Sequence, residues 1–467
     1  MGRTKEELKE AACRAIDAHR DDIIAFGDSI FAEPELGYKE VKTSEKFQKL
    51  LDSLGFAHQD HVALTGVIAN FKGKESKMKV ALMGELDAVV VPAHPCADPS
   101  TGAAHACGHH CMMAGLAGVA YALHDAEIME DLAGDIALMA VPSEEFVELE
   151  YRNRLREEGK IAFLGGKQEF IRLGAMDDVD VMVMQHTQST SGEQIKANAG
   201  SPANGFVGKL VRYIGKEAHA GGAPFDGINA LNAAEIGLAA IHAQRETFRD
   251  EDHIRVHPII TKGGDLVNIV PSDVRIETYV RGARVEAILD ASRKVNRALE
   301  AGAYAVGAQC EITELPGYLP VVTHQPLAEL MYENLCVLIG KEHTECISAS
   351  SGGSTDAGDI SHLLPTVHAY IGGAKGGAHC PDYFIEDKDM AYIVSAKALI
   401  MTAIDLLADG AETGRMVKET FKPVMTKEEY LKSWGHLQKE IQRKERRRAA
   451  RWMKAFPQGR AAAIFYR

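Results

Sequence analysis

The chain has 467 residues and a mass of 50.7 kDa, which is more than one compact core holds and predicts two or three domains. Its 46% apolar and 25% charged residues are typical of a folded globular protein and exclude collagen-like, low-complexity and disordered classes. The formal net charge of -14 argues against nucleic acid as the main partner, although residues 443–451 are basic.

Hydropathy and cysteine usage predict the compartment. No apolar run approaches the roughly 20 residues that a membrane helix needs, and the charged start of the chain lacks the apolar core of a signal peptide. The eight cysteines are scattered without the spacing of a disulfide framework. We therefore expect a cytoplasmic protein with reduced thiols and no membrane partner.

The first part of the chain predicts alternating helices and strands. Thr4 and Glu7 have the spacing of a capping box, and apolar residues then recur with helical period until Pro34 ends the pattern. Later apolar runs predict strands over 62–71, 79–83, 135–141 and 179–184 and a helix over 112–124. This alternation indicates an α/β domain with a largely buried sheet.

Near residue 200 the pattern changes. A strand-like run, a helix over 230–243, two strand-like runs and a helix over 285–301 follow in the order β-α-β-β-α. This order predicts an embedded α+β unit of about 110 residues. Helix and strand patterns of the first kind then resume through residue 407. The expected domains are a catalytic α/β domain in two parts (1–200 and 314–413), an insert (201–313) and a basic C-terminal arm (414–467).

The densest group of reactive side chains lies between a predicted strand and a predicted helix. Cys107 and His109, with one glycine between them, can both reach one ion, and thiolate with imidazole suits zinc or another transition metal. Loops at the ends of buried strands are where α/β proteins place their sites. A buried structural cysteine with surface histidines is the alternative for this motif alone.

Carboxylates follow two other predicted strands. Glu85 and Asp87 lie two apart at a strand end and therefore share a face. Glu144 and Glu145 follow a buried strand, where one carboxylate can bind metal while its neighbour acts as general base. A solvated loop explains the first pair and a charged helix start the second equally well.

Histidines follow two more strands, at His186 and His379, where a structural histidine is the alternative for each alone. Taken together, four strand ends carry five nitrogen, oxygen or sulfur donors. Such a set suits two ions that share a hydroxide. The five donors are Cys107, His109, Glu145, His186 and His379.

These motifs resemble the metal-dependent aminoacylase/carboxypeptidase superfamily, in its amidohydrolase branch with p-aminobenzoyl-glutamate and indole-acetyl-amino-acid hydrolases. The resemblance covers about residues 33–405. It is carried by PELGYKE from Pro34, GELDA from Gly84, HACGHH from His105, PSEE from Pro142, QH ending at His186, EAHAGGAPFDGINAL around His219, GGDLVNIVPSDVRIETYVRG around Asn268 and Arg281, STDAGDIS from Ser354 and GGAHCPD from Gly376.

The resemblance implies a di-metal exopeptidase-like catalytic domain, with a mixed sheet flanked by helices, and an inserted α+β lid domain that forms a homodimer. It implies two divalent ions, zinc or manganese, held by the five donors named above. Glu144 is the implied general base, and Asp87 the carboxylate that supports the site. His219 is implied to reach the site of the other subunit and stabilise an oxyanion there.

The resemblance also implies a site for a small-molecule carboxylate substrate. Asn268 and Arg281 are implied lid residues. Arg281, with the backbone of Gly352 and Gly353, is a candidate clamp, because a guanidinium binds a carboxylate through two parallel hydrogen bonds. A surface ion pair of little energetic weight is the alternative for Arg281.

The expected function is amide hydrolysis of an N-acyl or N-aroyl amino acid, or of a small dipeptide, by a metal-bridged hydroxide with Glu144 as base. The sequence departs from the family pattern at Glu85, at His110 and in the insert 91–101. Because of that altered loop, a hydrolytic deaminase of an aromatic amine such as an aminobenzoate stays open. An inactive metal-binding scaffold is disfavoured, since the base and all five donor positions are filled.

Overall fold

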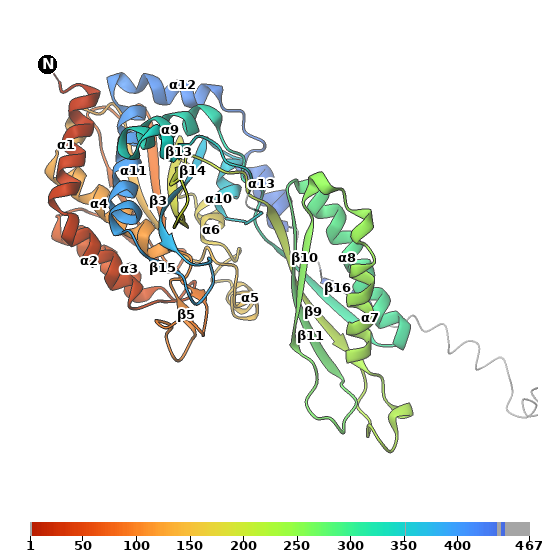
Figure 1. The fold of residues 1–467 in the computed structure, drawn as a ribbon. Coiled ribbons are helices and arrows are strands. Elements are labelled where there is room, and N and C mark those ends of the chain that lie inside the picture. The colour runs from red at the N-terminus through yellow and green to blue at the C-terminus, as the bar shows by residue number, and fades with distance from the viewer. Residues whose placement is uncertain (1, 351, 437–439, 444–467) are drawn as a thin grey trace, which may run out of the picture. The chain divides into compact units, whose positions relative to one another are not determined.

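The computed structural model describes residues 2–350, 352–436 and 440–443, and the chain divides into two compact units (Figure 1). Unit 2 overlaps the predicted insert at residues 201–313, except that a short segment, Arg281–Val285, belongs to unit 1. Within the described residues, unit 1 also includes 2–206 and 316–436, and unit 2 consists of 207–280, 286–315 and 440–443.

Unit 1 is built on a mixed sheet with the strand order β1-β2-β6-β3-β7-β14-β8-β13. The central strands β6, β3, β7 and β14 are parallel, whereas β2 runs antiparallel to β6 and β15 to β14. The small strands β4 and β5 pair with each other. The strands are β1 (Gln59–Val62), β2 (Gly66–Phe71), β3 (Lys79–Glu85), β4 (Val89–Val90), β5 (Ala103–Ala104), β6 (Asp135–Val141), β7 (Val181–Ser189), β8 (Ala197–Asn198), β13 (Thr344–Glu345), β14 (Thr366–Lys375) and β15 (Phe384–Ile385).

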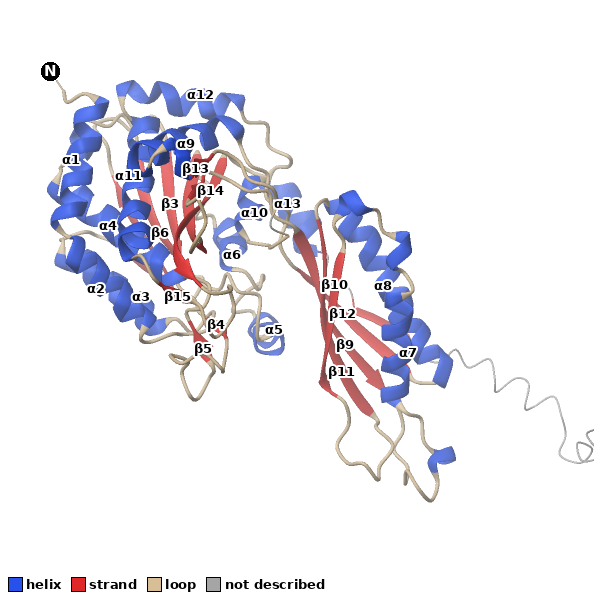
Figure 2. Cartoon of the chain, in the orientation of Figure 1, coloured by secondary structure: helices blue, strands red, loops and turns tan. Residues whose placement is uncertain are grey.

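Helices pack on this sheet in layers (Figure 2). α4 and α11 contact β3 and β7, and α1 and α2 pack on α4. Almost every residue of α4 is buried, as expected for a helix that is apolar nearly all round. The helices of unit 1 are α1 (Lys5–Ala18), α2 (Arg20–Phe31), α3 (Val41–Ser53), α4 (His109–Asp125), α5 (Leu149–Glu157), α6 (Gly166–Leu173), α9 (Gln325–Ile339), α10 (Ala357–Ser361), α11 (Ser395–Leu407), α12 (Glu412–Thr420) and α13 (Lys427–Ser433).

One segment corrects the hydropathy prediction. Asp389–Leu407, a π-helical turn followed by α11, is long and apolar enough to cross a membrane, so the prediction that no run approaches that length is wrong. In the structure, 83% of its apolar window is buried inside the protein. The segment is therefore a core helix of unit 1, and its apolar surface is covered by neighbouring helices and strands.

Unit 2 is a sheet with the strand order β10-β11-β9-β12-β16 and two helices. Every second residue of β11 is buried, which is the pattern of a strand with one covered face. Apolar residues of β9, β11, α7 and α8 form one core cluster. The elements are β9 (Gly205–Ile214), α7 (Ala230–His242), β10 (Arg255–Lys262), β11 (Asp273–Gly282), α8 (Val285–Val306), β12 (Gln309–Pro316) and β16 (Glu440–Arg443), and the predicted β-α-β-β-α order is confirmed.

Other local predictions are confirmed, and one is refined. The capping box of Thr4 and Glu7 is present at the start of α1, and the strand over 135–141 is β6. The opening helical stretch divides at His19 into α1 and α2.

The C-terminal arm begins differently from the prediction. Residue 414 lies inside α12, and residues up to 436 pack on unit 1. Tyr430 is buried and donates a hydrogen bond to Asp359 Oδ1 at 2.7 Å, and Trp434 Nε1 donates to the carbonyl oxygen of Gly317 at 2.9 Å. The predicted boundary at 414 is therefore wrong. Most of the basic remainder, residues 444–467, lies outside the described residues.

Candidate active site

The candidate site lies at the carboxyl ends of the parallel strands of unit 1. β3 leads into Asp87, β6 into Glu144 and Glu145, and β14 into His379, while His186 lies in the second half of β7. β3 lies between β6 and β7, so the chain after β3 adds β6 on one side of it and later adds β7 on the other side. Such a switch point is where open α/β sheets place their ligands.

A tight turn places Cys107 and His109 beside these strand ends. Gly108, between them, has a φ of 98° and caps the start of α4. A Cβ on Gly108 would lie 2.5 Å from the hydroxyl of Tyr383, which donates a hydrogen bond to the carbonyl oxygen of Cys107 at 3.2 Å. Only glycine satisfies both the left-handed backbone and this close approach.

Asp87 joins three parts of the site. Its carboxylate accepts hydrogen bonds from the backbone N–H of Glu144 at 3.1 Å and of Glu145 at 2.9 Å. Nδ1 of His109 lies 2.8 Å from the carbonyl oxygen of Asp87 and 3.2 Å from its Oδ1. These contacts favour the proton on Nδ1 and leave Nε2 of His109 as the donor atom for a ligand.

The structure brings all five predicted donors together in two overlapping groups. Donor atoms of Cys107, His109 and His186 lie within 4.8 Å of one another, and so do those of Cys107, Glu145 and His379. Cys107 Sγ is 3.4 Å from His186 Nε2, and Glu145 Oε1 is 2.9 Å from His379 Nε2. Thiolate, imidazole and carboxylate in one cluster are the donors of transition-metal sites, so the residues fit divalent ions.

Charges in the cluster favour the metal-binding forms. Burial and Glu145 raise the pKa of the Cys107 thiol, but His186 and His109 outweigh them and lower it to about 6. A thiolate, the form that binds metal, is therefore accessible at neutral pH. Burial, helped by the charges of Glu85 and Glu145, raises the pKa of Glu144 well above its usual range. This environment therefore favours the protonated form of Glu144 over its carboxylate.

Two residues of the site loops have left-handed backbone. Ser143, directly before Glu144, has a φ of 57°, and His379 has a φ of 60°. Such conformations cost on the order of 1–3 kcal/mol and persist where neighbours enforce them. Ser143 N donates to Glu40 Oε1 at 2.8 Å, and His379 N donates to the carbonyl oxygen of Ala106 at 2.8 Å. Both loops are thus tied to other loops of the same site.

The sequence analysis missed two charged residues beside the cluster. Lys167, in α6, lies 2.5 Å from Glu85 Oε1 and 2.5 Å from Asp356 Oδ1, and all three side chains are completely buried. Burial raises the pKa of Glu85, but Lys167 and His109 reverse this and lower it to about 2. Lys167 lies in no recognisable motif. Asp356 belongs to STDAGDIS, which marked the family resemblance without pointing to a role.

The predicted lid residues His219 and Asn268 lie together in unit 2. The Nδ1 atom of exposed His219 accepts hydrogen bonds from the backbone N–H of Gly221 at 3.1 Å and of Gly222 at 2.9 Å, so Nε2 carries the proton. The carbonyl oxygen of Asn268 accepts from Ala220 N at 2.9 Å. His219 thus presents an N–H donor to a ligand outside its own loop.

The predicted carboxylate clamp lies in unit 1. Arg281 donates a hydrogen bond to Ser354 Oγ at 2.8 Å, and its guanidinium lies 5.3 Å from the ring centre of Phe206. The carbonyl oxygen of Gly353 accepts from Asn204 N at 2.8 Å. Arg281 is therefore held close to the segment that carries Gly352 and Gly353.

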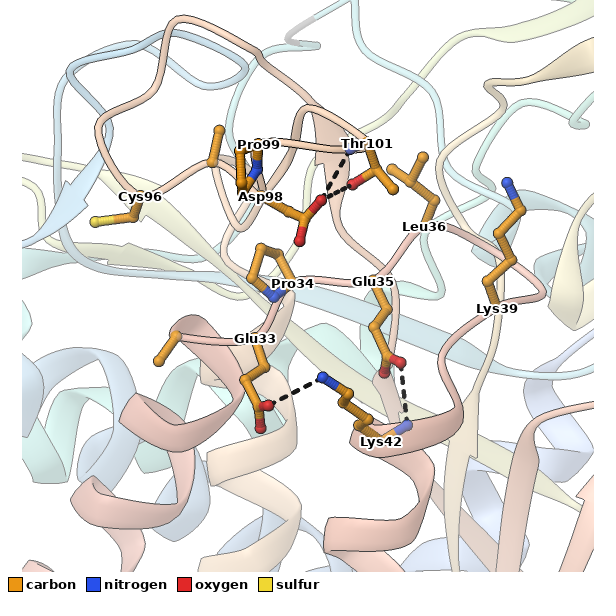
Figure 3. A pocket seen from close by; sticks show the side chains of 12 residues that line it. Glu33, Pro34, Glu35, Leu36, Lys39, Lys42, Cys96, Asp98, Pro99 and Thr101 are labelled. Atoms are coloured by element: carbon orange, nitrogen blue, oxygen red, sulfur yellow. Dashed lines mark hydrogen bonds and ion pairs between the residues drawn. The ribbon is translucent and has the colours of Figure 1, made fainter.

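A separate cavity of about 500 Å³ lies between the segment after α2 and the unusual insert (Figure 3). Glu33 pairs with Lys42 Nζ at 3.1 Å, and Glu35 accepts from the backbone N–H of Lys42 at 3.1 Å. Asp98, in the insert, accepts from Thr101 N at 2.8 Å. None of the five donors lines this cavity, and each of its carboxylates already has a partner within the chain.

The profile of peptidase family M20/M25/M40 matches residues 81–403. The chain belongs to this family. Its members are metal-dependent hydrolases of C–N bonds, so the predicted family, fold class and enzyme type are confirmed, and the use of divalent metal ions is supported.

Two enzymes and one solved structure are similar to this chain. The chain is 28% identical to a mouse Xaa-Arg dipeptidase (Mus musculus) over 91% of this chain and 95% of the relative. It is 27% identical to an N-acyl-L-amino acid amidohydrolase of Geobacillus stearothermophilus over 69% of this chain and 82% of the relative. A dinuclear metal-binding M20 peptidase of Bacillus subtilis has the same fold, with a TM-score of 0.60 and 21% identity over 84% of this chain and 99% of the other.

Proposed function

We propose that this enzyme hydrolyses the amide bond of an N-acyl or N-aroyl amino acid, or of a small dipeptide. The observation that carries the proposal is the convergence of five metal donors and Glu144 at the carboxyl ends of parallel strands. The names of the mouse dipeptidase and the Geobacillus amidohydrolase both describe substrates with an amide bond to an amino acid, which supports the same substrate class here.

We propose that the donor cluster holds two divalent ions, zinc or manganese, in each subunit. Cys107, His109 and His186 form one donor group, and Glu145 and His379 join Cys107 in the other. When bound, such ions polarise the scissile carbonyl and acidify a water molecule. Asp87 orients both groups, because it contacts His109 and the backbone of Glu145.

Glu144 is the proposed general base and acid. It takes a proton from the attacking water and delivers it to the nitrogen of the leaving amine. Its raised pKa favours retention of the proton between these two steps. Tyr318 donates a hydrogen bond to the carbonyl oxygen of Glu144, and Glu144 Oε2 lies 3.9 Å from His109 Nε2. The backbone contact keeps the carboxylate beside the donor cluster.

The proposed clamp for the substrate carboxylate is Arg281 with the backbone of Gly352 and Gly353. The ring of Phe206 and the hydroxyl of Ser354 both contact the guanidinium. A planar guanidinium and backbone N–H groups recognise a carboxylate and not a particular side chain. The clamp therefore explains selection of an amino-acid product without explaining which amino acid it is.

We further propose a homodimer through unit 2, with His219 stabilising the oxyanion in the site of the other subunit. β10 is an edge strand of its sheet, and Ile259 and Ile260 on it are 60% and 43% exposed. An apolar edge strand favours association with another chain. A second copy of unit 2 would cover this edge.

The test is a substrate panel with metal-loaded protein. N-acyl amino acids, N-aroyl amino acids and dipeptides that end in Arg, Lys, Glu or Gly are incubated with it, and the products are separated by liquid chromatography with mass detection. Release of a free amino acid that is absent with Glu144→Gln is expected. Release of ammonia without a free amino acid would instead identify a deaminase and overturn the proposal.

A further inference from the structure

Glu85 lies at the end of β3 and has two different neighbours. Its Oε1 is bound by Lys167, and its Oε2 lies 3.1 Å from Nε2 of His109. Glu85 Oε2 and His109 Nε2 have no other hydrogen-bond partner within the described part of the chain. The buried carboxylate oxygen and the buried ring nitrogen therefore face each other and pair only as ions, when the ring of His109 carries a second proton. A cation that replaces this proton would bind both atoms.

The spacing matches two ligands of one ion. Metal–nitrogen and metal–oxygen bonds of about 2.0–2.2 Å place neighbouring ligands of one ion about 3 to 3.5 Å apart. The 3.1 Å between Glu85 Oε2 and His109 Nε2 falls in this range. Donor atoms of Glu85, His109 and Glu144 also lie within 4.8 Å of one another, so the cluster extends beyond the five predicted donors.

The local charge points the same way. Glu85, Asp356 and Lys167 are completely buried and together carry two negative charges and one positive charge. The ring of His109 supplies a second positive charge when it is protonated, and a divalent ion at this position would supply the same compensation. Lys167 occupies Oε1 of Glu85, which restricts the carboxylate to binding a cation through Oε2 alone.

We propose that Glu85 is a sixth metal-binding residue, which binds the ion held by His109 through Oε2 and is oriented by Lys167 and Asp356. This inference rests on the proposed donor set. The proposal gives a role to Glu85, the residue at which the GELDA motif departs from the family pattern. A purely structural role, in which Glu85 only balances the charge of Lys167, is the reading that the experiment must separate.

The test measures metal affinity and not turnover. Metal-free protein is titrated with Zn²⁺ against a chromophoric chelator, the number of bound ions is counted by elemental analysis, and Co²⁺ titration follows the thiolate-to-cobalt absorption of Cys107. Four proteins are compared with the wild type: Glu85→Gln, Glu85→Asp, Glu169→Gln and Cys107→Ala. Glu169 is the matched control, because it is also a completely buried glutamate but accepts hydrogen bonds from the backbone of Ala162 and Phe163 instead of contacting the donor cluster.

We expect Glu85→Gln to weaken binding of one ion at least about tenfold, since even residues that only support metal ligands contribute that much. Glu85→Asp keeps the charge beside Lys167 but withdraws the carboxylate from His109, so it should also weaken binding. It carries the test if Glu85→Gln does not fold. Glu169→Gln should bind both ions like the wild type.

Wild-type affinity in folded Glu85→Gln or Glu85→Asp would overturn the proposal, even if the melting temperature fell. Equal losses in the Glu85 and Glu169 variants would also overturn it, because the effect would then be general to buried carboxylates. Failure of the wild type to bind metal, or an unchanged Cys107→Ala, would instead overturn the donor set on which the inference rests.

Discussion

Lys167 in unit 1 and Lys209 in unit 2 are both completely buried, but their partners differ. Lys209 Nζ contacts Glu314 Oε1 at 2.5 Å, Ser292 Oγ at 2.7 Å and Asn296 Oδ1 at 2.7 Å, so a single carboxylate balances its charge. Lys167 instead has two carboxylates, and one of them borders the metal donors.

The pKa shifts of the two lysines follow from this difference. At Lys209 burial outweighs the single carboxylate and lowers the pKa of the ammonium group. At Lys167 burial also lowers the pKa, but Asp356 and Glu85 together outweigh it and raise the value. The Lys209 cluster is balanced and fully hydrogen-bonded, whereas Glu85 in the Lys167 cluster keeps one oxygen facing the ring of His109, where it can be shared with a cation. We infer that the Lys209 cluster is structural and that the Lys167 cluster supports the proposed metal site.

The largest effect is expected at Glu144, which places the chemistry in unit 1. Glu144→Gln should lower turnover by about 10³ to 10⁴, because an amide cannot accept the proton that the attacking water loses. Metal content should stay at the wild-type level. Steady-state kinetics on the best substrate, with elemental analysis of the same sample, checks both. Substantial turnover in the metal-loaded variant would remove the proposed role of Glu144.

In unit 2, breaking the buried ion pair of Lys209 and Glu314 should change only the stability of the folded protein. Lys209→Met leaves Glu314 without its cation and should lower the free energy of unfolding by about 3 kcal/mol. Urea unfolding measures the loss, and metal affinity should not change. The double variant Lys209→Met with Glu314→Leu should recover most of the stability, since an apolar pair replaces the ion pair. Loss of metal affinity in Lys209→Met would contradict the comparison.

His219 links unit 2 to catalysis. His219→Ala should lower turnover on the order of 10²-fold without changing metal content, because it removes an oxyanion donor. Mixing this variant with Glu144→Gln should restore about half of the wild-type activity per dimer, since one site then has Glu144 and the other subunit's His219. Exchange of subunits is verified first by pull-down of a tagged copy. No recovery after proven exchange would exclude a role across the dimer.

The smallest effect is expected at single donor residues. Cys107→Ala and His379→Ala should each weaken metal binding at least about tenfold, as each removes one of several donors. Elemental analysis after dialysis against a metal buffer measures the change. Lys209→Met serves as the control, because its cluster is not part of the site. Wild-type metal content in both donor variants would mean that the donor set is wrong.

Much of the site could be predicted from local sequence patterns. Cys107, Glu145, His186 and His379 each follow or end an apolar run, and parallel strands bring such positions to one edge of a sheet. The deaminase alternative, the homodimer and the cytoplasmic location stay predictions.

Other features depend on contacts that no local pattern encodes. Lys167 and Asp356 are 189 residues apart, and neither flanking stretch signals an ion pair. The helices α5 and α6 were not predicted, and the packing of Tyr430 onto Asp359 joins the supposed arm to unit 1. Burial of a charged side chain is set by the elements that surround it, so it becomes visible only in the folded chain.

By itself, the sequence determined which residue types stand at the strand ends and that an α+β unit interrupts the α/β unit, because hydropathy period and turn residues act over a few neighbours. Tertiary structure alone decided that Glu85 shares His109 with the donor cluster, that Lys167 neutralises half of the Glu85 and Asp356 pair, and that Lys209 is balanced within unit 2. The physical reason is that charge balance depends on distance in space, and residues far apart in the chain supply the charges.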